Sequence, residues 1–310
     1  MALSVMRMVL PVLVMILIGY LTNRKGIISK EGLSGVKSFV SHVTLPAVLF
    51  NAFFTADYTK TTIISFTLVY AALGLAMLIG FALRKAGAPF EKFMPMLVTG
   101  WEGGMLGYAL FSLLYGNAGT KVFAIADIGQ TVFAFSLFIS VLKVIGGEKP
   151  RVKTLALNML TNPASAGMLL GILLGATGVY AWLSSASFFP VFEALIGFIG
   201  APTSALILLV LGYELSFKKS LMKPVMRTVA LRLVIMAALC AAASFILFRL
   251  IPYDKQLMAA LMLGFSLPAP FIIPLFADVG EHGEYISTTL SVQALLSIVM
   301  FAGIAVFSLS

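Results

Sequence analysis

The feature that most constrains this chain is a series of long apolar stretches separated by short polar ones. Of the 310 residues, 60% are hydrophobic and only 11% are charged, whereas a soluble domain is usually about 25% charged. A membrane-spanning helix needs roughly 20 apolar residues. The sequence therefore predicts an all-α integral membrane protein of about ten transmembrane helices, with little chain left for a soluble domain.

The apolar stretches set the expected order of the spans. We expect them near residues 3–22, 34–55, 61–83, 92–115, 121–143, 154–177, 189–213, 226–250, 256–277 and 285–308. The first apolar run is expected to stay as a helix, because Arg24 and Lys25 follow it instead of preceding it as in a signal peptide.

Lysine and arginine gather in alternate loops, and this bias sets orientation in a membrane. The basic loops hold Arg24, Lys25 and Lys30; Arg84, Lys85 and Lys92; Lys149, Arg151 and Lys153; and Lys218, Lys219, Lys223 and Arg227. They are predicted to face the cytoplasm, so that both termini lie outside a cell (inner) membrane. The acidic loop at 278–284 is an exception, but acidic residues contribute little to the rule. The net charge of +9 is thus explained by topology, and we expect membrane lipid and no nucleic acid as a partner.

The polar segment around residues 146–153 divides the expected spans into two halves of five. An odd number of spans per half forces the second half to run upside down, as in the inverted repeats of secondary transporters. We therefore expect a first five-helix repeat at 1–144, a cytoplasmic linker at 145–153 and a second, inverted repeat at 154–310.

The fourth and ninth expected spans occupy corresponding positions in the two halves, and both contain helix-breaking residues. Proline removes a backbone donor, glycine permits unusual torsions, and broken helices at matching positions point to a transporter's binding site. The candidate substrate- or ion-binding residues here are Gly103, Gly104, Gly107 and Tyr108 in the fourth span and Ser266, Pro268, Pro270 and Pro274 in the ninth. The alternative is that the small residues only permit close helix packing and the prolines only kink a helix.

Glu102 is the one charged residue in the stretch from Phe93 to Thr120. It lies about ten residues beyond Lys92, which at about 1.5 Å per residue places it about 15 Å deep. A charge there costs at least about 2.5–3.5 kcal/mol. Glu102 is a candidate proton acceptor or cation ligand; the alternative is a neutral, hydrogen-bonded carboxyl that only stabilises packing.

Three further polar side chains are candidates for the same site. Asp127 and Gln130 are three residues apart and share a helix face, although Asp127 could instead reach the outer surface. Gln293 lies in the middle of the tenth expected span, where an amide either belongs to a site or joins helices.

Other polar and breaking positions are expected to be structural. Pro46, Asn51, Pro163 and Pro202 mark helix breaks, His42 also flanks the Pro46 kink, and Asn158 and Asn162 are expected to cap the sixth span. Charged residues near span ends are expected to be interfacial: Glu193, Glu214, Arg232 and Arg249. No arginine is expected at the midplane.

The order of these features resembles that of a known family. Its elements are VLPVLVMILIGYLTNRKGIIS at 9–29, LPAVLF at 45–50, Asn162-Pro163, and APTSALILLVLGYEL at 201–215. Together they resemble the auxin efflux carrier family of membrane permeases, within the wider group that shares the bile-acid:sodium symporter fold.

The resemblance implies a scaffold of spans 1, 2, 6 and 7, through which two copies can form a homodimer. It implies a moving core of spans 3–5 and 8–10, with spans 4 and 9 crossing at the substrate, and substrates such as auxin, malate or malonate. The chain departs from the family at the fourth span. Glu102 stands where many members have asparagine, Gly104-Met105 stands for Gly-Phe, and Gly107-Tyr108-Ala109-Leu110 stands for Gly-x-Pro-Leu, so glycines must provide the break.

These observations predict a secondary active transporter of small organic anions with elevator-type alternating access and proton coupling. The alternatives are a sodium-coupled symporter and an uncoupled uniporter. No cofactor is expected beyond a coupling H⁺ or Na⁺, and no metal site, because Cys240 is the single cysteine and there are two histidines. An enzyme is disfavoured because the sequence contains no HExxH or GxSxG motif, and a receptor-like or structural role is disfavoured by the lack of a soluble domain.

Overall fold

The structure, a computed structural model, describes residues 2–147, 160–273, 277 and 279–309. Within these ranges the chain forms helices and no strand, which confirms the all-α prediction. The long helices of the first half are α1 (Ala2–Arg24), α2 (Lys30–Phe39), α3 (Leu45–Phe54), α4 (Lys60–Ala82), α6 (Tyr108–Phe133) and α7 (Ile139–Gly146). Those of the second half are α9 (Pro163–Ala176), α11 (Phe189–Gly200), α12 (Thr203–Glu214), α13 (Met222–Leu250), α14 (Lys255–Ser266) and α16 (Gly283–Leu309).

Short helices connect these elements. Two α-helical turns are α5 (Met94–Leu97) and α10 (Val179–Leu183), and three wider, π-helical segments are η1 (Val40–Thr44), η3 (Gly103–Gly107) and η4 (Ala134–Phe138). Three 3₁₀ turns are η2 (Arg84–Gly87), η5 (Lys219–Leu221) and η6 (Gly280–His282).

In the described part of the chain, seven helical runs are long and apolar enough to cross a membrane. They coincide with the first, second, third, fifth, seventh, eighth and tenth expected spans. Two of the other three, the fourth and the ninth, are interrupted by non-helical residues. The remaining one, the sixth, is represented by the shorter apolar helix α9, because residues 148–159, which hold Asn158 and most of the expected linker, lie outside the described ranges.

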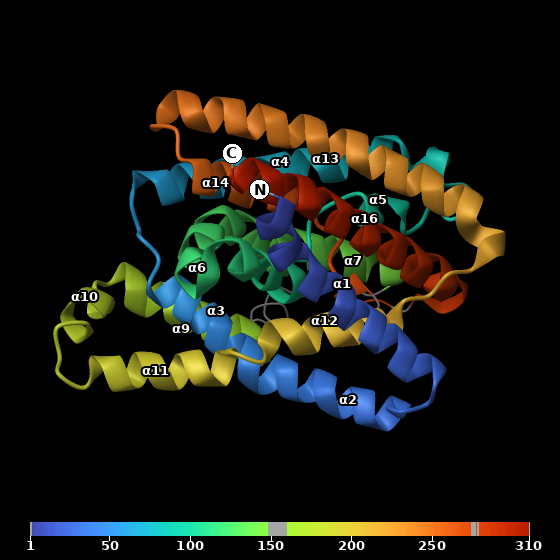
Figure 1. Cartoon of the computed structure of the whole chain (residues 1–310). Helices are drawn as coiled ribbons and strands as arrows, with labels where there is room; N and C mark the ends of the chain where they lie inside the picture. Colours follow the sequence, from blue (N-terminus) through green and yellow to red (C-terminus); the bar gives the residue numbers. More distant parts are fainter. Residues whose placement is uncertain (1, 148–159, 274–276, 278, 310) are drawn as a thin grey trace.

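Helices from opposite halves of the chain pack as two close pairs. Helix α1 lies along α12, and α3 lies along α9 (Figure 1). Glycine makes both approaches possible: a Cβ added at Gly171 would lie 2.6 Å from the Phe50 carbonyl oxygen, and one at Gly19 or Gly212 would overlap the backbone of the partner helix. These contacts are the small-residue helix packing typical of membrane proteins.

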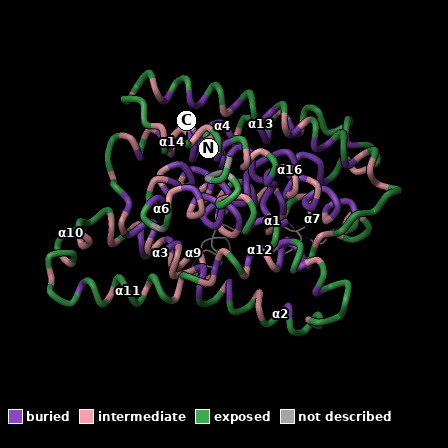
Figure 2. Tube along the Cα trace, viewed as in Figure 1, coloured by how far each residue is buried: buried purple, intermediate pink, exposed green. Residues whose placement is uncertain are grey.

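A second group of helices packs around α6 and α14, where buried residues are concentrated. Helix α6 packs against α4 and α14, and α13 packs against α4, α14 and α16. Figure 2 shows buried residues concentrated along α6 and α14 and exposed residues along the outer sides of α13, α2 and α11. Many of the exposed residues are large and apolar, such as Val234 and Phe198, as expected of surfaces that face lipid.

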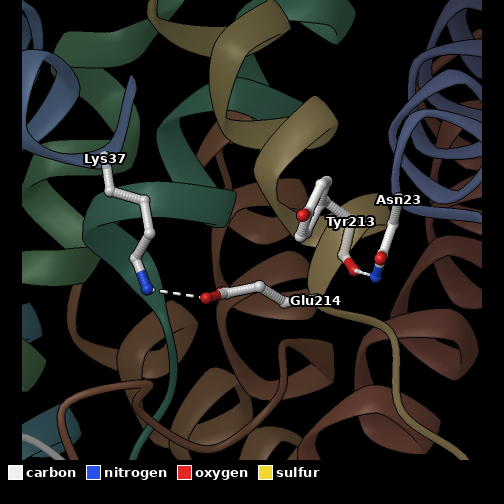
Figure 3. Close-up of polar contacts among 4 residues, drawn as sticks. All are labelled: Asn23, Lys37, Tyr213 and Glu214. Carbon is white, nitrogen blue, oxygen red and sulfur yellow. Dashed lines mark hydrogen bonds and ion pairs between the residues drawn. The ribbon is translucent and has the colours of Figure 1, made fainter. Parts of the chain in front are cut away.

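Polar contacts join α1, α2 and α12 at one end of the molecule. Figure 3 shows Asn23 Nδ2 donating to the Tyr213 carbonyl at 2.7 Å and Lys37 Nζ paired with Glu214 Oε1 at 2.6 Å. The Tyr213 hydroxyl also donates to the Ile28 carbonyl at 3.0 Å. The last carbonyls of a helix have no partner within it, so the Asn23 contact pairs one carbonyl at the end of α12.

The predicted structural breaks fall at helix boundaries. Pro46 follows the π-helical segment η1 at the start of α3, and Pro202 separates α11 from α12. Pro163 opens α9, and the Asn162 side chain accepts a hydrogen bond from the Ser165 N–H at 3.1 Å, so the capping interpretation of Asn162 is confirmed. Asn51 lies half-buried within α3. The exposed His42 ring contacts the Ser41 hydroxyl and the Ser38 carbonyl on the other side of Pro46 in the sequence.

The close approach of α3 and α9 generates a stability prediction. Gly171→Ala places a methyl group against the α3 backbone, which cannot move without shifting a helix, so we expect a loss of about 1–3 kcal/mol. Gly74→Ala is the matched control, because its added Cβ meets open space within helix α4. Thermal unfolding in detergent should show a lower Tm for Gly171→Ala and an equal or higher Tm for the control. Equal Tm values for Gly171→Ala and the unaltered protein would contradict the prediction.

Candidate functional site

The fourth and ninth expected spans are each interrupted, and the two interruptions lie against each other. We call the residues of the interruptions, 98–102 and 267–271, the crossing, and the stretches that contain them, 94–107 and 255–271, the broken segments. Helix α5 ends at Leu97, and helical structure resumes at Gly103. Helix α14 ends at Ser266, and the residues after it are non-helical. Gly100 adopts φ +69°, a backbone conformation that glycine tolerates and other residues rarely adopt.

The two segments of the crossing contact each other through backbone atoms. The Glu102 N–H donates to the Pro268 carbonyl at 2.9 Å. A Cβ added at Gly100 would lie 3.1 Å from Pro270 Cγ, so the glycine of one segment accommodates the proline of the other. The sequence prediction that these two spans are the broken ones agrees with this geometry.

The Glu102 carboxylate pairs with one amide from each broken segment. Its Oε1 accepts from the Met105 N–H at 3.0 Å and its Oε2 from the Phe271 N–H at 2.7 Å. Glu102 is thereby the N-cap of the helical run that begins at Gly103, where unpaired N–H groups favour an anion. The side chain is buried, so its charge is stabilised by these donors instead of by water.

Arg232 corrects one of the sequence predictions. It was expected to be interfacial, and no arginine was expected at the midplane. Instead it lies ten residues inside α13, about 15 Å from that helix's start, and is 4% exposed. Its Nη2 donates to the Gly100 and Leu267 carbonyls, both at 2.6 Å, and its Nη1 to the Leu97 carbonyl at 3.4 Å. The other charged residues grouped with it, Glu193, Glu214 and Arg249, are exposed as expected.

Two glutamine side chains pair further backbone groups of the crossing. Gln293 of α16 accepts from the Ala269 N–H at 2.9 Å and donates to the Leu97 carbonyl at 2.9 Å, so it joins both broken segments. Gln130 of α6 donates to the Trp101 carbonyl at 2.7 Å. Gln130 Oε1 is buried without a hydrogen-bond partner, which leaves one acceptor available at the crossing.

Asp127 lies inside this network and does not reach the outer surface, so the alternative reading of that residue is wrong. It is 1% exposed. Trp101 Nε1 donates to its Oδ1 at 2.8 Å and the Thr131 hydroxyl donates to its Oδ2 at 2.9 Å. A Cβ at Gly103 would overlap this carboxylate, so glycine is needed there for contact with Asp127.

The remaining candidate residues line the crossing or its approach. Gly107 packs against Phe123 and Leu267, and Tyr108 is buried. Gly104 is half-buried with open space around it: an added Cβ would meet only Glu102 Oε1, at 3.8 Å. The Ser266 hydroxyl bonds within α14, whereas its carbonyl accepts from Ser297. Pro274 lies outside the described residues.

The structural positions are separate from this network. Pro46 and Asn51 belong to α3, Pro163 to α9 and Pro202 to the turn before α12. Helices α6 and α12 contact each other at Ser112 and Ser204, whose hydroxyl oxygens are 3.5 Å apart. Within the described ranges, no three His, Cys, Asp or Glu side chains are grouped so as to hold a metal ion.

The sequence contained a signal that would have found Arg232. Buried residues of α13 recur at helical spacing on both sides of it: Val225, Val229, Ile235, Met236 and Leu239. Arg232 shares the face that this periodicity defines. With the span expected to start near residue 226, Arg232 lies near its end, and for that reason it was interpreted as interfacial.

The fold and the crossing define a multi-pass membrane protein whose central polar groups are held by two broken helices. Residues 4–152 match the family model described as membrane transport protein. A second similarity is to an uncharacterized transporter of Methanothermobacter thermautotrophicus strain Delta H, which is 24% identical over 299 residues, 94% of each chain.

These comparisons make the protein a membrane transporter and not an enzyme. The match over residues 4–152, just under half of the chain, includes the elements at 9–29 and 45–50 that carry the resemblance to the auxin efflux carrier family, and it supports that resemblance.

The bridge made by Gln293 leads to a testable expectation. Gln293→Leu leaves a buried N–H and removes one donor to a buried carbonyl, each loss costing about 1–3 kcal/mol, so we expect a lower Tm and reduced transport. Gln256→Leu is the control, because Gln256 is exposed on α14. If Gln293→Leu unfolds at the same temperature as the control, the bridge contributes no stability and the expectation fails.

Proposed function

We propose that this transporter is a secondary active carrier of small organic anions, of the malate, malonate or auxin type, that is coupled to protons. The observation that carries the proposal is the position of the Glu102 carboxylate. It accepts one N–H from each broken segment. The crossing therefore has the donors that a carboxylate needs, arranged as at a helix N-terminus that binds anions.

Competition for these donors supplies a coupling mechanism. While Glu102 is ionised, its own carboxylate holds both amides. A proton on Glu102 removes its charge and weakens those hydrogen bonds, since a neutral acceptor binds an N–H less strongly. The amides then become available to the carboxylate of a substrate. Gly104 is half-buried, and a Cβ added there would lie 3.8 Å from Glu102 Oε1, in ordinary van der Waals contact.

The charges of the crossing also favour uptake of a positive charge. Glu102 and Asp127 are negative when ionised and Arg232 is positive, so the three buried groups sum to one negative charge. One proton neutralises this sum, whereas a substrate anion alone would add to it. Because a charge crossing about 100 mV is worth about 2.3 kcal/mol, a co-transported proton is also what an anion needs to enter a cell with a negative interior.

For alternating access we propose that one group of helices moves relative to another. We propose a scaffold of α1, α3, α9, α11 and α12, and a moving core of α4, α6, α13, α14 and α16 that carries the crossing. The pairing of α1 with α12 and of α3 with α9 is what an inverted repeat of 1–144 and 154–310 predicts, since each pair joins the first helix of one half to the second of the other. The core would slide along the scaffold past Ser112 and Ser204, in the manner of an elevator.

We further propose a cell (inner) membrane location with both termini outside, from the distribution of lysine and arginine. The exposed apolar face of α11, which includes Val191 and Phe198, belongs to the scaffold and would contact lipid or the second subunit of a homodimer. Current measurements on liposomes with malate, malonate and indole-3-acetate, each with and without a pH gradient, would test the substrate class. A current for one acid that grows with the gradient is expected, and electroneutral transport would need a flux assay.

Sodium-coupled transport is the second candidate, because backbone carbonyls at helix breaks are sodium ligands in other transporters. Replacing sodium by potassium in the same assay distinguishes the two. A current that requires sodium would favour this candidate, and one indifferent to both sodium and pH would indicate uniport.

Glu102→Gln is the variant that tests proton coupling. The amide is close in shape but carries no ionisable group, so we expect dependence on the pH gradient to disappear, while exchange of substrate across the membrane continues. Glu193→Gln, at an exposed glutamate of α11, is the matched control and should keep the dependence. If transport by Glu102→Gln depends on the pH gradient as strongly as transport by the unaltered protein, the proposal of proton coupling through Glu102 is wrong.

A further inference from the structure

Arg232 occupies a place made of backbone carbonyls. Its guanidinium donates to the carbonyl oxygens of Leu97, Gly100 and Leu267, at 3.4, 2.6 and 2.6 Å. Leu97 closes the single turn α5, and Leu267 follows the longer helix α14, at whose C-terminal end the helix dipole is negative. Carbonyl oxygens in such positions coordinate cations in other transporters.

No carboxylate accounts for the burial of this charge. Among the described residues, no Asp or Glu forms an ion pair with Arg232. Arg232 is 4% exposed, and in the described part of the chain its guanidinium donates to carbonyl oxygens. The carboxylate at the crossing, Glu102, faces amides instead. The two charges are thus sorted by the dipoles that they meet: the anion pairs with N–H groups and the cation with C=O groups.

We propose that Arg232 is a resident cation. Its guanidinium fills a carbonyl-lined cation site at the crossing, so that no free sodium ion binds there, and its removal converts the place into a site for a small free cation. A sodium ion cannot share these carbonyls with the guanidinium, because like charges a few ångströms apart repel strongly in a buried setting. This rests on the proposed function only in treating the crossing as the transport site.

The test is chemical complementation of Arg232→Ala, followed by thermal unfolding of the full chain in detergent. Guanidinium, sodium and choline chlorides are compared at equal ionic strength, with guanidinium kept far below denaturing concentrations. We expect a low Tm that rises saturably, by about 2–4 °C or more, with guanidinium. Sodium should have a smaller effect and the bulky choline none, and the unaltered protein should not respond.

Two further variants keep the outcome decisive. Arg249→Ala removes an exposed arginine from the end of the same helix and should show no response to any of the salts. Arg232→Gln removes the charge with a shorter polar side chain and is used if Arg232→Ala cannot be purified. Recovery of folded Arg232→Ala only in guanidinium would itself support the proposal. In liposomes, sodium should stimulate transport by Arg232→Gln several-fold and leave the unaltered protein unaffected.

The proposal is overturned if neither Arg232 variant is stabilised by guanidinium or sodium. This holds whether the variants unfold at a lower temperature or at the same temperature as the unaltered protein. Arg232 would then hold the backbone in place without occupying a cation site. It is also overturned if the unaltered protein itself needs sodium. The unfolding measurement requires neither substrate nor transport. It can therefore fail while organic-anion transport holds, and hold while the choice of substrate proves wrong.

Discussion

The backbone groups that two broken helices leave unpaired are the constraint on which this structure depends. At membrane depth no bulk water is available to pair them, so the chain must supply every partner. It does so with a small number of side chains: Glu102 takes amides, Arg232 takes carbonyls, and Gln293 takes one of each. The breaks persist because these contacts replace the hydrogen bonds that a continuous helix would have made.

This pairing also joins the helices around the crossing to one another by polar contacts. The partners of the broken segments come from α6, α13 and α16, so three helices are fastened to one centre. The pairs α1–α12 and α3–α9 instead meet where glycine lets backbones touch. Polar contacts to a common centre hold the helices of the proposed core together, which is what movement of that core as a unit would require.

The sequence predicted the positions of the breaks better than it predicted their partners. Runs of glycine at 100–107 and of proline at 268–274 mark disrupted helix on local chemistry alone, and the Asp127–Gln130 spacing placed both side chains on one helix face. The partners depend on tertiary contacts between distant segments. Arg232 is separated from Gly100 by 132 residues, and the local sequence around either residue does not predict their contact. Asp127 was open to two interpretations because its partner, Trp101, is likewise set by folding.

The two breaks are different in kind, and each depends on the other. The first segment lacks proline and turns at Gly100, whose positive φ no bulkier residue would adopt easily. The second turns at Pro268 and Pro270, and the Pro270 ring packs onto Gly100. A side chain at Gly100 would press against that ring, and the loss of Pro270 would leave Gly100 facing a gap. The chain has Ala109 where the family that it resembles has the proline of its fourth-span pattern, so glycine makes the break in the first segment. The presence of glycine in one segment and proline in the other is therefore a single packing solution, and it brings the Glu102 N–H to the Pro268 carbonyl and the Glu102 carboxylate to the amide after Pro270.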